Sequence, residues 1–306
     1  MVCDVDMQND LDKDTIKLLS EILEITIDDG FSFEGLSSDV LQEKAKQKSV
    51  LVLLGPGMPG ANCDKRLSDL SFLKFFPNLH RLILKGHKFN NLDSMPALPK
   101  LELLDLSFNE LLDLAGLPAL NSLEKLTLFG NRLENVSGIE SLLQLRFLNC
   151  NKNNIGNLFP IASLQNLETL HISWNPLSSL EGLKGLTSIK QLLCIACELE
   201  SLEGIENMYG LRELYCWDNC IASLAPVETC QTLEKIHCHE NRLTTLEPLR
   251  HLTLLRELQC QSNNIEDASA LSHLENLQEL WCWNNPRSAT KQMQELSQVK
   301  VCRSQY

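Results

Sequence analysis

Residues 213–219 read ELYCWDN, and a closely similar phrase, ELQCQSN, returns at residues 257–263. Each phrase ends in asparagine, with an apolar residue five and three positions before it. The same asparagine recurs at intervals of 22 residues, or twice 22, at Asn109, Asn131, Asn153, Asn175, Asn219, Asn241, Asn263 and Asn285. Cys197 fills the one missing place, and His87 ends an earlier phrase, RLILKGH. The chain therefore contains about ten copies of one repeat between about residues 70 and 285.

The alternation inside each phrase predicts a short β-strand, because successive side chains of a strand point to opposite faces. Residues at positions −5 and −3 from the asparagine are expected to point into a core, and those at −4 and −2 to point outward. One copy cannot bury its apolar edge alone, so neighbouring copies must stack. The sequence predicts an α/β solenoid with a parallel sheet.

The pattern resembles the leucine-rich repeat family, whose repeat is L-x-x-L-x-L-x-x-N/C-x-L. The openings LEGL (180–183), LEGI (202–205) and LEPL (246–249) are most similar to the class of the leucine-rich regulatory subunit of protein phosphatase 1. This resemblance implies a horseshoe with the sheet on its concave face, a helical N-terminal cap and a short C-terminal cap. We expect an acidic helical N-terminal region at 1–65, the solenoid at 66–286 and the C-terminal cap at 287–306.

The ends of the chain carry the patterns of these caps. Residues 12–27 and 37–48 predict two helices, and residues 50–60 predict a strand running into turns. After the last repeat, an Asn-Pro pair precedes a predicted short helix and an extended apolar segment. Residues 1–47 hold twelve acidic residues against four lysines, which favours a solvated acidic face over a docking tail for a basic partner.

Six cysteines fall at position −3, where leucine or isoleucine stands in other copies: Cys150, Cys194, Cys216, Cys238, Cys260 and Cys282. They are expected to form a ladder of buried, free thiols. Stacked copies also bring cysteines within reach of a disulfide, which is the alternative. The CIAC motif at 194–197 then holds two core positions of one copy, and does not form a zinc knuckle.

The outward columns gather aromatic residues and all four tryptophans of the chain, which predicts a protein-binding surface on the concave face. Its candidate residues are Phe129, His171, Trp174, Leu193, Ile195, Tyr215, Trp217, His237, His239, Glu240, Trp281 and Trp283. The C-terminal cap covering Trp281 and Trp283 is an alternative for that pair.

His237 and His239 share the outward face, which raises a metal site as an alternative. A structural zinc site needs four ligands and a catalytic one commonly three, so we expect no metal and no cofactor. A pH-sensitive contact with a partner is the favoured interpretation of the pair.

Composition narrows the classes of partner and compartment. The net charge of −13 disfavours nucleic acid as the main partner. No apolar run is long enough for a transmembrane helix, and the N-terminus does not have the layout of a secretory signal. Twelve cysteines in this context favour a reducing compartment, so a cytoplasmic or nuclear location without membrane partners is expected.

The sequence contains no G-x-S-x-G, H-E-x-x-H or phosphate-loop motif. It predicts a non-catalytic module that binds another protein on its concave face, as a regulatory or adaptor subunit. The family resemblance implies a phosphatase catalytic subunit as one possible partner. Alternatives are a bacterial effector, a cytoskeletal adaptor, self-association through Trp281 and Trp283, or a metal-dependent protein that uses the histidine pair.

Overall fold

The computed structural model describes residues 13–26, 37–296, 299 and 301–303. Two helices come first, α1 (Lys13–Thr26) and α2 (Ser38–Lys46), and α3 (Arg287–Gln294) follows the last repeat. The predicted helices at the N-terminus and the short C-terminal helix are thus confirmed. The acidic residues 1–12 lie outside the described part of the chain.

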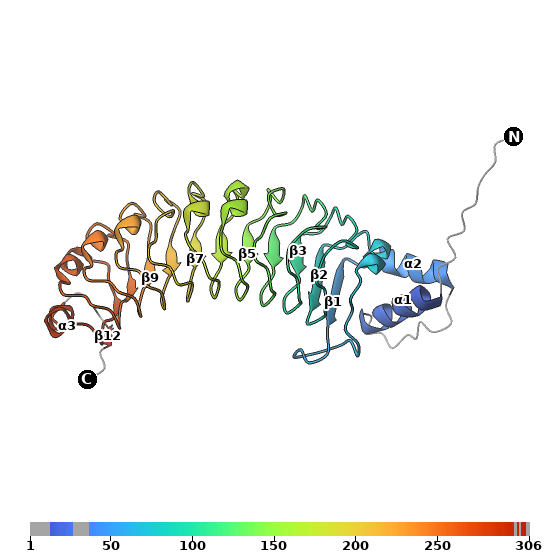
Figure 1. Ribbon diagram of the computed structural model, residues 1–306, viewed down its shortest axis with the longest axis horizontal. Helices are drawn as coiled ribbons and strands as arrows, with labels where there is room; N and C mark the ends of the chain where they lie inside the picture. Colours follow the sequence, from blue (N-terminus) through green and yellow to red (C-terminus); the bar gives the residue numbers. More distant parts are fainter. Residues whose placement is uncertain (1–12, 27–36, 297–298, 300, 304–306) are drawn as a thin grey trace.

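Within the described residues, twelve strands form one parallel sheet in sequence order. The sheet lines the inner side of an arch, and short 3₁₀ helices lie along its outer side (Figure 1). This is the predicted leucine-rich repeat horseshoe. The strands are β1 (Val50–Leu54), β2 (Arg81–Lys85), β3 (Leu103–Asp105), β4 (Lys125–Thr127), β5 (Phe147–Asn149), β6 (Thr169–His171), β7 (Gln191–Leu193), β8 (Glu213–Tyr215), β9 (Lys235–His237), β10 (Glu257–Gln259), β11 (Glu279–Trp281) and β12 (Val301–Arg303). The 3₁₀ helices are η1 (Ser71–Phe75), η2 (Phe159–Ser163), η3 (Glu181–Leu183), η4 (Ala225–Val227), η5 (Glu247–Leu249) and η6 (Ser269–His273).

The repeat period fixes the register of the solenoid strands. Tyr215 lies opposite Leu193 on one side and His237 on the other, each 22 residues away. Because adjacent parallel strands are spaced about 4.8 Å apart, residues with the same position in successive copies form straight columns. Every column can therefore be followed along the arch.

The core is built from the inward columns, and the cysteine ladder lies within it. Cys150, Cys194, Cys216, Cys238, Cys260 and Cys282 are each fully buried. They are free thiols, as predicted. Burial raises the pKa of Cys150 and of Cys238 to about 12, because the apolar surroundings disfavour the thiolate. The ladder is therefore part of the packing and is chemically quiet at neutral pH.

The repeated asparagine ties each copy to its neighbour. The Asn153 side-chain amide donates to the carbonyl oxygens of Leu128 and Cys150, each at 3.0 Å. Its Oδ1 accepts from the backbone N–H of Leu133 at 3.0 Å. These bonds satisfy backbone groups that the turn leaves unpaired, and such groups are costly to bury without partners.

The two substitutes preserve part of this role. The Cys197 thiol lies 3.3 Å from the carbonyl oxygens of Ile172 and Ile195. The His87 ring accepts from the backbone N–H of Leu67 through Nδ1 at 3.2 Å and contacts the Leu53 oxygen through Nε2 at 3.1 Å. Burial lowers the pKa of His87, so the ring stays neutral and can accept at one nitrogen.

The residue just before the asparagine position is left-handed in all ten copies. Its φ lies between +51° and +72°, in Gly86, Phe108, Gly130, Lys152, Trp174, Ala196, Asp218, Glu240, Ser262 and Asn284. Only glycine adopts this conformation without a steric cost. Eight of the ten copies nevertheless carry a side chain there, and this column lies at the rim of the concave face.

Helices α1 and α2 cover the first edge of the solenoid, burying Leu19, Leu23 and Leu41. Strand β1, predicted at the start of residues 50–60, continues the sheet by pairing with β2. At the other end, α3 buries Ala289 and Met293. Both ends thus carry a helix that shields apolar residues, as solenoid caps must.

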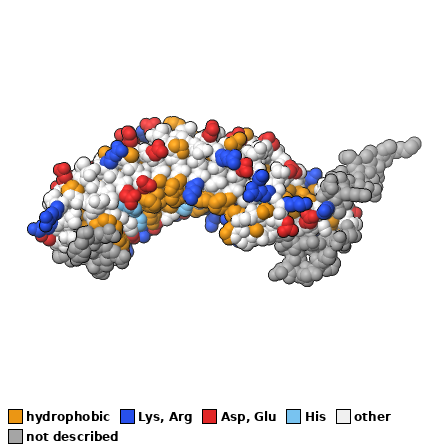
Figure 2. Space-filling view, turned by 60° about the horizontal axis from the view of Figure 1, so that its bottom comes forward, with side chains coloured by type: hydrophobic (Ala, Val, Ile, Leu, Met, Phe, Trp, Pro, Cys, Tyr) orange, Lys and Arg blue, Asp and Glu red, His pale blue; other side chains and the backbone are white. Residues whose placement is uncertain are grey.

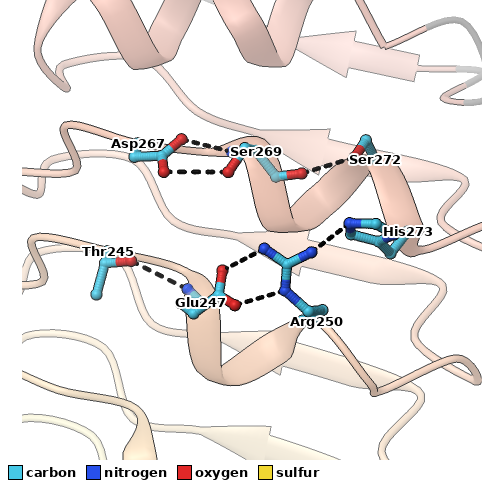
Figure 3. A network of polar contacts seen from close by, with 7 residues as sticks. All are labelled: Thr245, Glu247, Arg250, Asp267, Ser269, Ser272 and His273. Atoms are coloured by element: carbon cyan, nitrogen blue, oxygen red, sulfur yellow. Dashed lines mark hydrogen bonds and ion pairs between the residues drawn. The ribbon is translucent and has the colours of Figure 1, made fainter.

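On the outer side, polar groups bond within and between neighbouring copies (Figure 3). Arg250 donates through Nη2 to Glu247 Oε2 at 2.8 Å and also contacts His273 of the next copy. Ser269 donates to Asp267 at 3.0 Å. The polar side chains in and beside η5 and η6 therefore have partners within the molecule.

Candidate functional site

The concave face consists of the side chains at positions −6, −4, −2 and −1 of the ten copies. In most strands the middle residue is buried and the first and third are half-buried. The alternation predicted from the sequence is therefore present. Figure 2 shows hydrophobic side chains gathered over the middle of the inner surface, with histidine beside them toward the C-terminal end.

The N-terminal half of this face carries a run of aromatic rings. Phe108 and Phe129 meet edge to face, with ring centroids 5.0 Å apart. Lys152 Nζ lies 5.6 Å from the centroid of Phe129 and 5.3 Å from that of Trp174. Phe108 and Trp174 are 46% and 42% exposed, high values for large apolar side chains. The chain's own lysine thus occupies the cation–π position between these rings.

The centre of the face contains two aromatic pairs that join the copies of β8 and β9. Tyr215 meets His237 edge to face, with centroids 4.8 Å apart. Trp217 lies parallel to His239, with centroids 5.0 Å apart and ring planes inclined by 12°. We call the second pair the tryptophan–histidine stack. It joins neighbouring copies through side chains that the sequence placed on one face.

The remaining candidates differ in how much surface they offer. Leu193 and His171 are half-buried at −4, and Glu240 is exposed at −1. Ile195 is only 7% exposed, so it contributes little to a contact surface although it occupies an outward position. Its place at −2 is shared by other covered residues, including Ser173. Position −2 is therefore a less reliable guide to exposure than −4.

Trp281 and Trp283 are half-buried at the C-terminal end. Trp281 lies opposite Arg303 in the register of β11 and β12, so the sheet continues one strand beyond the pair. The side chains of β12 are outside the described residues. Exposure to a partner and cover by the cap both remain predictions for these two tryptophans.

The first residue of each solenoid strand, at position −6, was not predicted to be part of the face. Glu213 accepts from the Tyr215 hydroxyl at 3.0 Å and from Gln191 Nε2 at 2.6 Å. Glu257 contacts His237 Nε2 and Lys235 Nζ, each at 2.7 Å. Position −6 is two residues before −4, so the alternation of a strand places it on the same face as −4 and −2. The column at −6 could therefore have been predicted from the sequence.

Burial sets the protonation of His237 and His239. Burial lowers the pKa of His237, although the Glu257 hydrogen bond raises it in part. Burial, with a smaller repulsion from His237, lowers the pKa of His239 to about 4. Both rings are therefore neutral at pH 7, and protonation of the stack moves to acidic pH.

The histidine pair does not converge on one point. His237 bonds to Glu257, whereas His239 stacks on Trp217. In the described part of the chain, no three His, Cys, Asp or Glu side chains lie together as metal ligands would. The geometry places the two rings in a network of ring and hydrogen-bond contacts on the concave face.

Comparison with known proteins agrees with this architecture. Residues 253–297 match the family described as Leucine Rich repeats (2 copies). No curated protein matches the chain. Among the helices of the described residues, none is long and apolar enough to cross a membrane.

Several solved structures share the fold. An internalin (inlF) from Listeria monocytogenes is 20% identical with a TM-score of 0.72, over 96% of this chain and 91% of that one. The functional domain of InlJ from the same organism, described as including a cysteine ladder, is 18% identical with a TM-score of 0.71, over 94% and 58%. FLRT2, solved in an octameric complex with Latrophilin 3 and Unc5D, is 19% identical with a TM-score of 0.60, over 85% and 88%. At these identities the likeness is one of fold.

Proposed function

We propose that this leucine-rich repeat solenoid is a non-catalytic module that binds a protein partner on its concave face. The observation that carries the proposal is the aromatic row across the sheet, in which Phe108, Phe129 and Trp174 precede Tyr215 and Trp217. Tryptophan and tyrosine contribute most of the binding energy at many interfaces. A row of this kind on a curved sheet suits a rounded protein surface.

The fold supports this class of function without naming the partner. The FLRT2 repeats were solved in complex with other proteins, so a solenoid of this shape can serve in assemblies. Solenoid copies supply a long, rigid surface whose residues change without disturbing the core. No catalytic step is part of the proposal.

A finer proposal is a regulatory or adaptor subunit in the cytoplasm or nucleus. Ten described cysteines are free, which favours a reducing compartment. The repeat resemblance makes a phosphatase catalytic subunit one partner to test. Binding of purified protein phosphatase 1 catalytic subunit to the immobilised chain supports this proposal, and no binding at about 10 µM rejects it.

The general proposal is tested with two matched double variants in a cross-linking pull-down from native cells. Phe108→Ala with Trp174→Ala removes rings from the concave face. Phe159→Ala with Tyr209→Ala removes rings that are 63% and 59% exposed outside the strands of that face. We expect the first variant to lose a specific partner at least about tenfold and the second to keep it.

Circular dichroism melting of both variants serves as the control for folding. Equal retention of the partner by a folded concave-face variant rejects the proposal. Equal loss in both variants also rejects it, because the surface outside the strands would then matter as much.

A further inference from the structure

The two halves of the concave face differ in charge. Among the four copies from His87 to Asn153, positions −6, −4, −2 and −1 carry the cations Arg81, Lys85, Lys125 and Lys152 and the anion Asp105. Among the six copies from Asn175 to Asn285, the same positions carry Lys235 and the anions Glu213, Asp218, Glu240, Glu257 and Glu279. The charge of the face therefore changes between Lys152 and Trp174, and the tryptophan–histidine stack lies within the anionic half.

Three of the five cations of the face have a partner within it. Lys152 lies over Phe129 and Trp174, Lys85 pairs with Asp105 at 2.7 Å, and Lys235 pairs with Glu257 at 2.7 Å. No lysine or arginine of the described residues lies over the tryptophan–histidine stack as Lys152 lies over its rings. The N-terminal rings have an internal cation, whereas the central ring pair has none.

Two carboxylates flank this stack at the rim. Asp218 and Glu240 directly follow its two rings in the chain and occupy the same position in adjacent copies. Their backbones are held in place, since the Asp218 N–H donates to the His239 oxygen at 3.1 Å and the Glu240 N–H to the Gln261 oxygen at 3.0 Å. Both side chains are exposed, and neither forms an ion pair with a described residue.

An unsatisfied acceptor lies beside the stack in the same column. Gln261 stands at −2 in the copy after that of His239 and is 8% exposed. Its Oε1 and the His239 Nδ1 are buried polar atoms without a hydrogen-bond partner. Buried polar atoms are normally paired, so this pair marks a place where a donor is missing. The His239 ring is neutral at pH 7, so its Nδ1 can accept a hydrogen bond and does not repel a cation.

One chemical group complements all of these features. A group that stacks on an indole, pairs with two carboxylates and donates several hydrogen bonds without accepting any is a guanidinium. Lysine meets the charge requirement but lacks the planar, forked geometry. Neutral aromatic or acidic groups fail to complement the carboxylates.

Building on the proposed concave-face function, we propose that the tryptophan–histidine stack, with Asp218 and Glu240, docks an arginine side chain of the protein partner. The guanidinium lies against the ring pair, and its outer N–H groups reach the two carboxylates. A turn of the Gln261 amide lets Oε1 accept an inner N–H. Arginine docking here places the basic side of the partner over the C-terminal half of the arch.

The test uses a defined probe and the full chain labelled with ¹⁵N. The four tryptophans give four indole N–H resonances, and Trp217→Phe identifies the one from the stack. The peptide acetyl-Gly-Arg-Gly-amide is titrated, followed by its citrulline and lysine counterparts. Citrulline keeps the shape of arginine without the charge, and lysine keeps the charge without the plane.

We expect the arginine peptide to shift the Trp217 resonance saturably, with a Kd on the order of 1 mM. Citrulline and lysine peptides should bind at least about threefold more weakly. Asp218→Asn with Glu240→Gln should weaken arginine binding about fivefold. The matched control is Glu102→Gln with Glu124→Gln, which neutralises exposed carboxylates of two adjacent copies away from the stack and should leave binding unchanged.

No saturable shift of Trp217, an equal shift by citrulline, or binding that the Asp218/Glu240 variant leaves intact overturns the proposal. Equal binding of the lysine peptide overturns its guanidinium specificity. Failure here is distinguishable from failure of the general function. If the Phe108/Trp174 variant still loses its cellular partner while the peptide test fails, the concave face binds protein without this arginine contact.

Discussion

The asparagine that closes each phrase shows how much one side chain does in this molecule. Its amide bonds to two carbonyl oxygens and its oxygen to one N–H, and the pattern recurs from Asn131 to Asn285 with small changes. The period of the sequence predicted both the series and its substitutes, His87 and Cys197. It could not predict that Asn109 Oδ1 is left without a partner, because that depends on the atypical copy before it.

Asn153→Ala is expected to lower the free energy of unfolding by about 2–3 kcal/mol, because buried backbone groups lose their partners. The neighbouring Asn154 is exposed, and Asn154→Ala should change it by less than about 0.5 kcal/mol. Urea unfolding followed by circular dichroism measures both. Equal effects of the two substitutions would contradict the role assigned to the buried amide.

Burial of the ladder thiols predicts a loss of stability at alkaline pH. The pKa of Cys150 is raised from 9.0 to about 12 on folding, so its contribution is complete below about pH 9 and declines as pH rises toward 12. Relative to Cys150→Leu, the free energy of unfolding of the natural chain should fall by about 1 kcal/mol between pH 9 and pH 10. A difference that stays constant over this range would contradict the buried, protonated thiol.

At the scale of the element, the strands are short and their alternation decides which side chains meet a partner. The sequence predicted the inward columns correctly, since leucine, isoleucine and cysteine occupy them. It predicted the outward columns less well. The predicted columns began five residues before the asparagine, so they did not include Glu213 and Glu257 at −6. Ile195, predicted to face outward, is almost completely buried. Exposure at an outward position depends on the size of its neighbours, which periodicity does not encode.

Two adjacent leucines of β7 test this alternation directly. Leu192 is fully buried, and Leu192→Ala should cost about 3 kcal/mol of unfolding free energy through the cavity it leaves. Leu193 is half-buried on the concave face, so Leu193→Ala should cost less than about 1 kcal/mol. Denaturant unfolding compares the two, and the reverse order would place the core on the wrong side of the sheet.

At the scale of the whole molecule, the arch presents one long surface with a cationic N-terminal half and an anionic C-terminal half, and aromatic rings lie in both. The horseshoe could be predicted from the sequence, because ten copies of the repeat follow one another in register. The ring contacts and ion pairs on the surface could not be predicted from the sequence, because they depend on side-chain rotamers. Trp217 and His239 were both expected on the face, but their parallel stacking was not.

Loss of the Trp217 ring should affect binding far more than folding. Trp217→Ala is expected to weaken binding of the natural partner by about 2 kcal/mol or more, because indoles at the centre of an interface dominate its energy. Tyr209→Ala, outside the strands, should leave affinity unchanged. Calorimetric titration with the partner identified by pull-down measures both, and full affinity in Trp217→Ala would remove the stack from the interface.

The left-handed residue at the rim has a consequence for engineering. Phe108, Lys152, Trp174, Asp218 and Glu240 all have φ values near +55°, where a Cβ atom costs on the order of 1 kcal/mol relative to glycine. Replacing these residues by glycine one at a time would relieve that strain and raise the thermal stability of the protein. The same substitutions would remove aromatic and acidic side chains that are proposed to contact the partner. A variant made more thermostable in this way should therefore bind its partner more weakly.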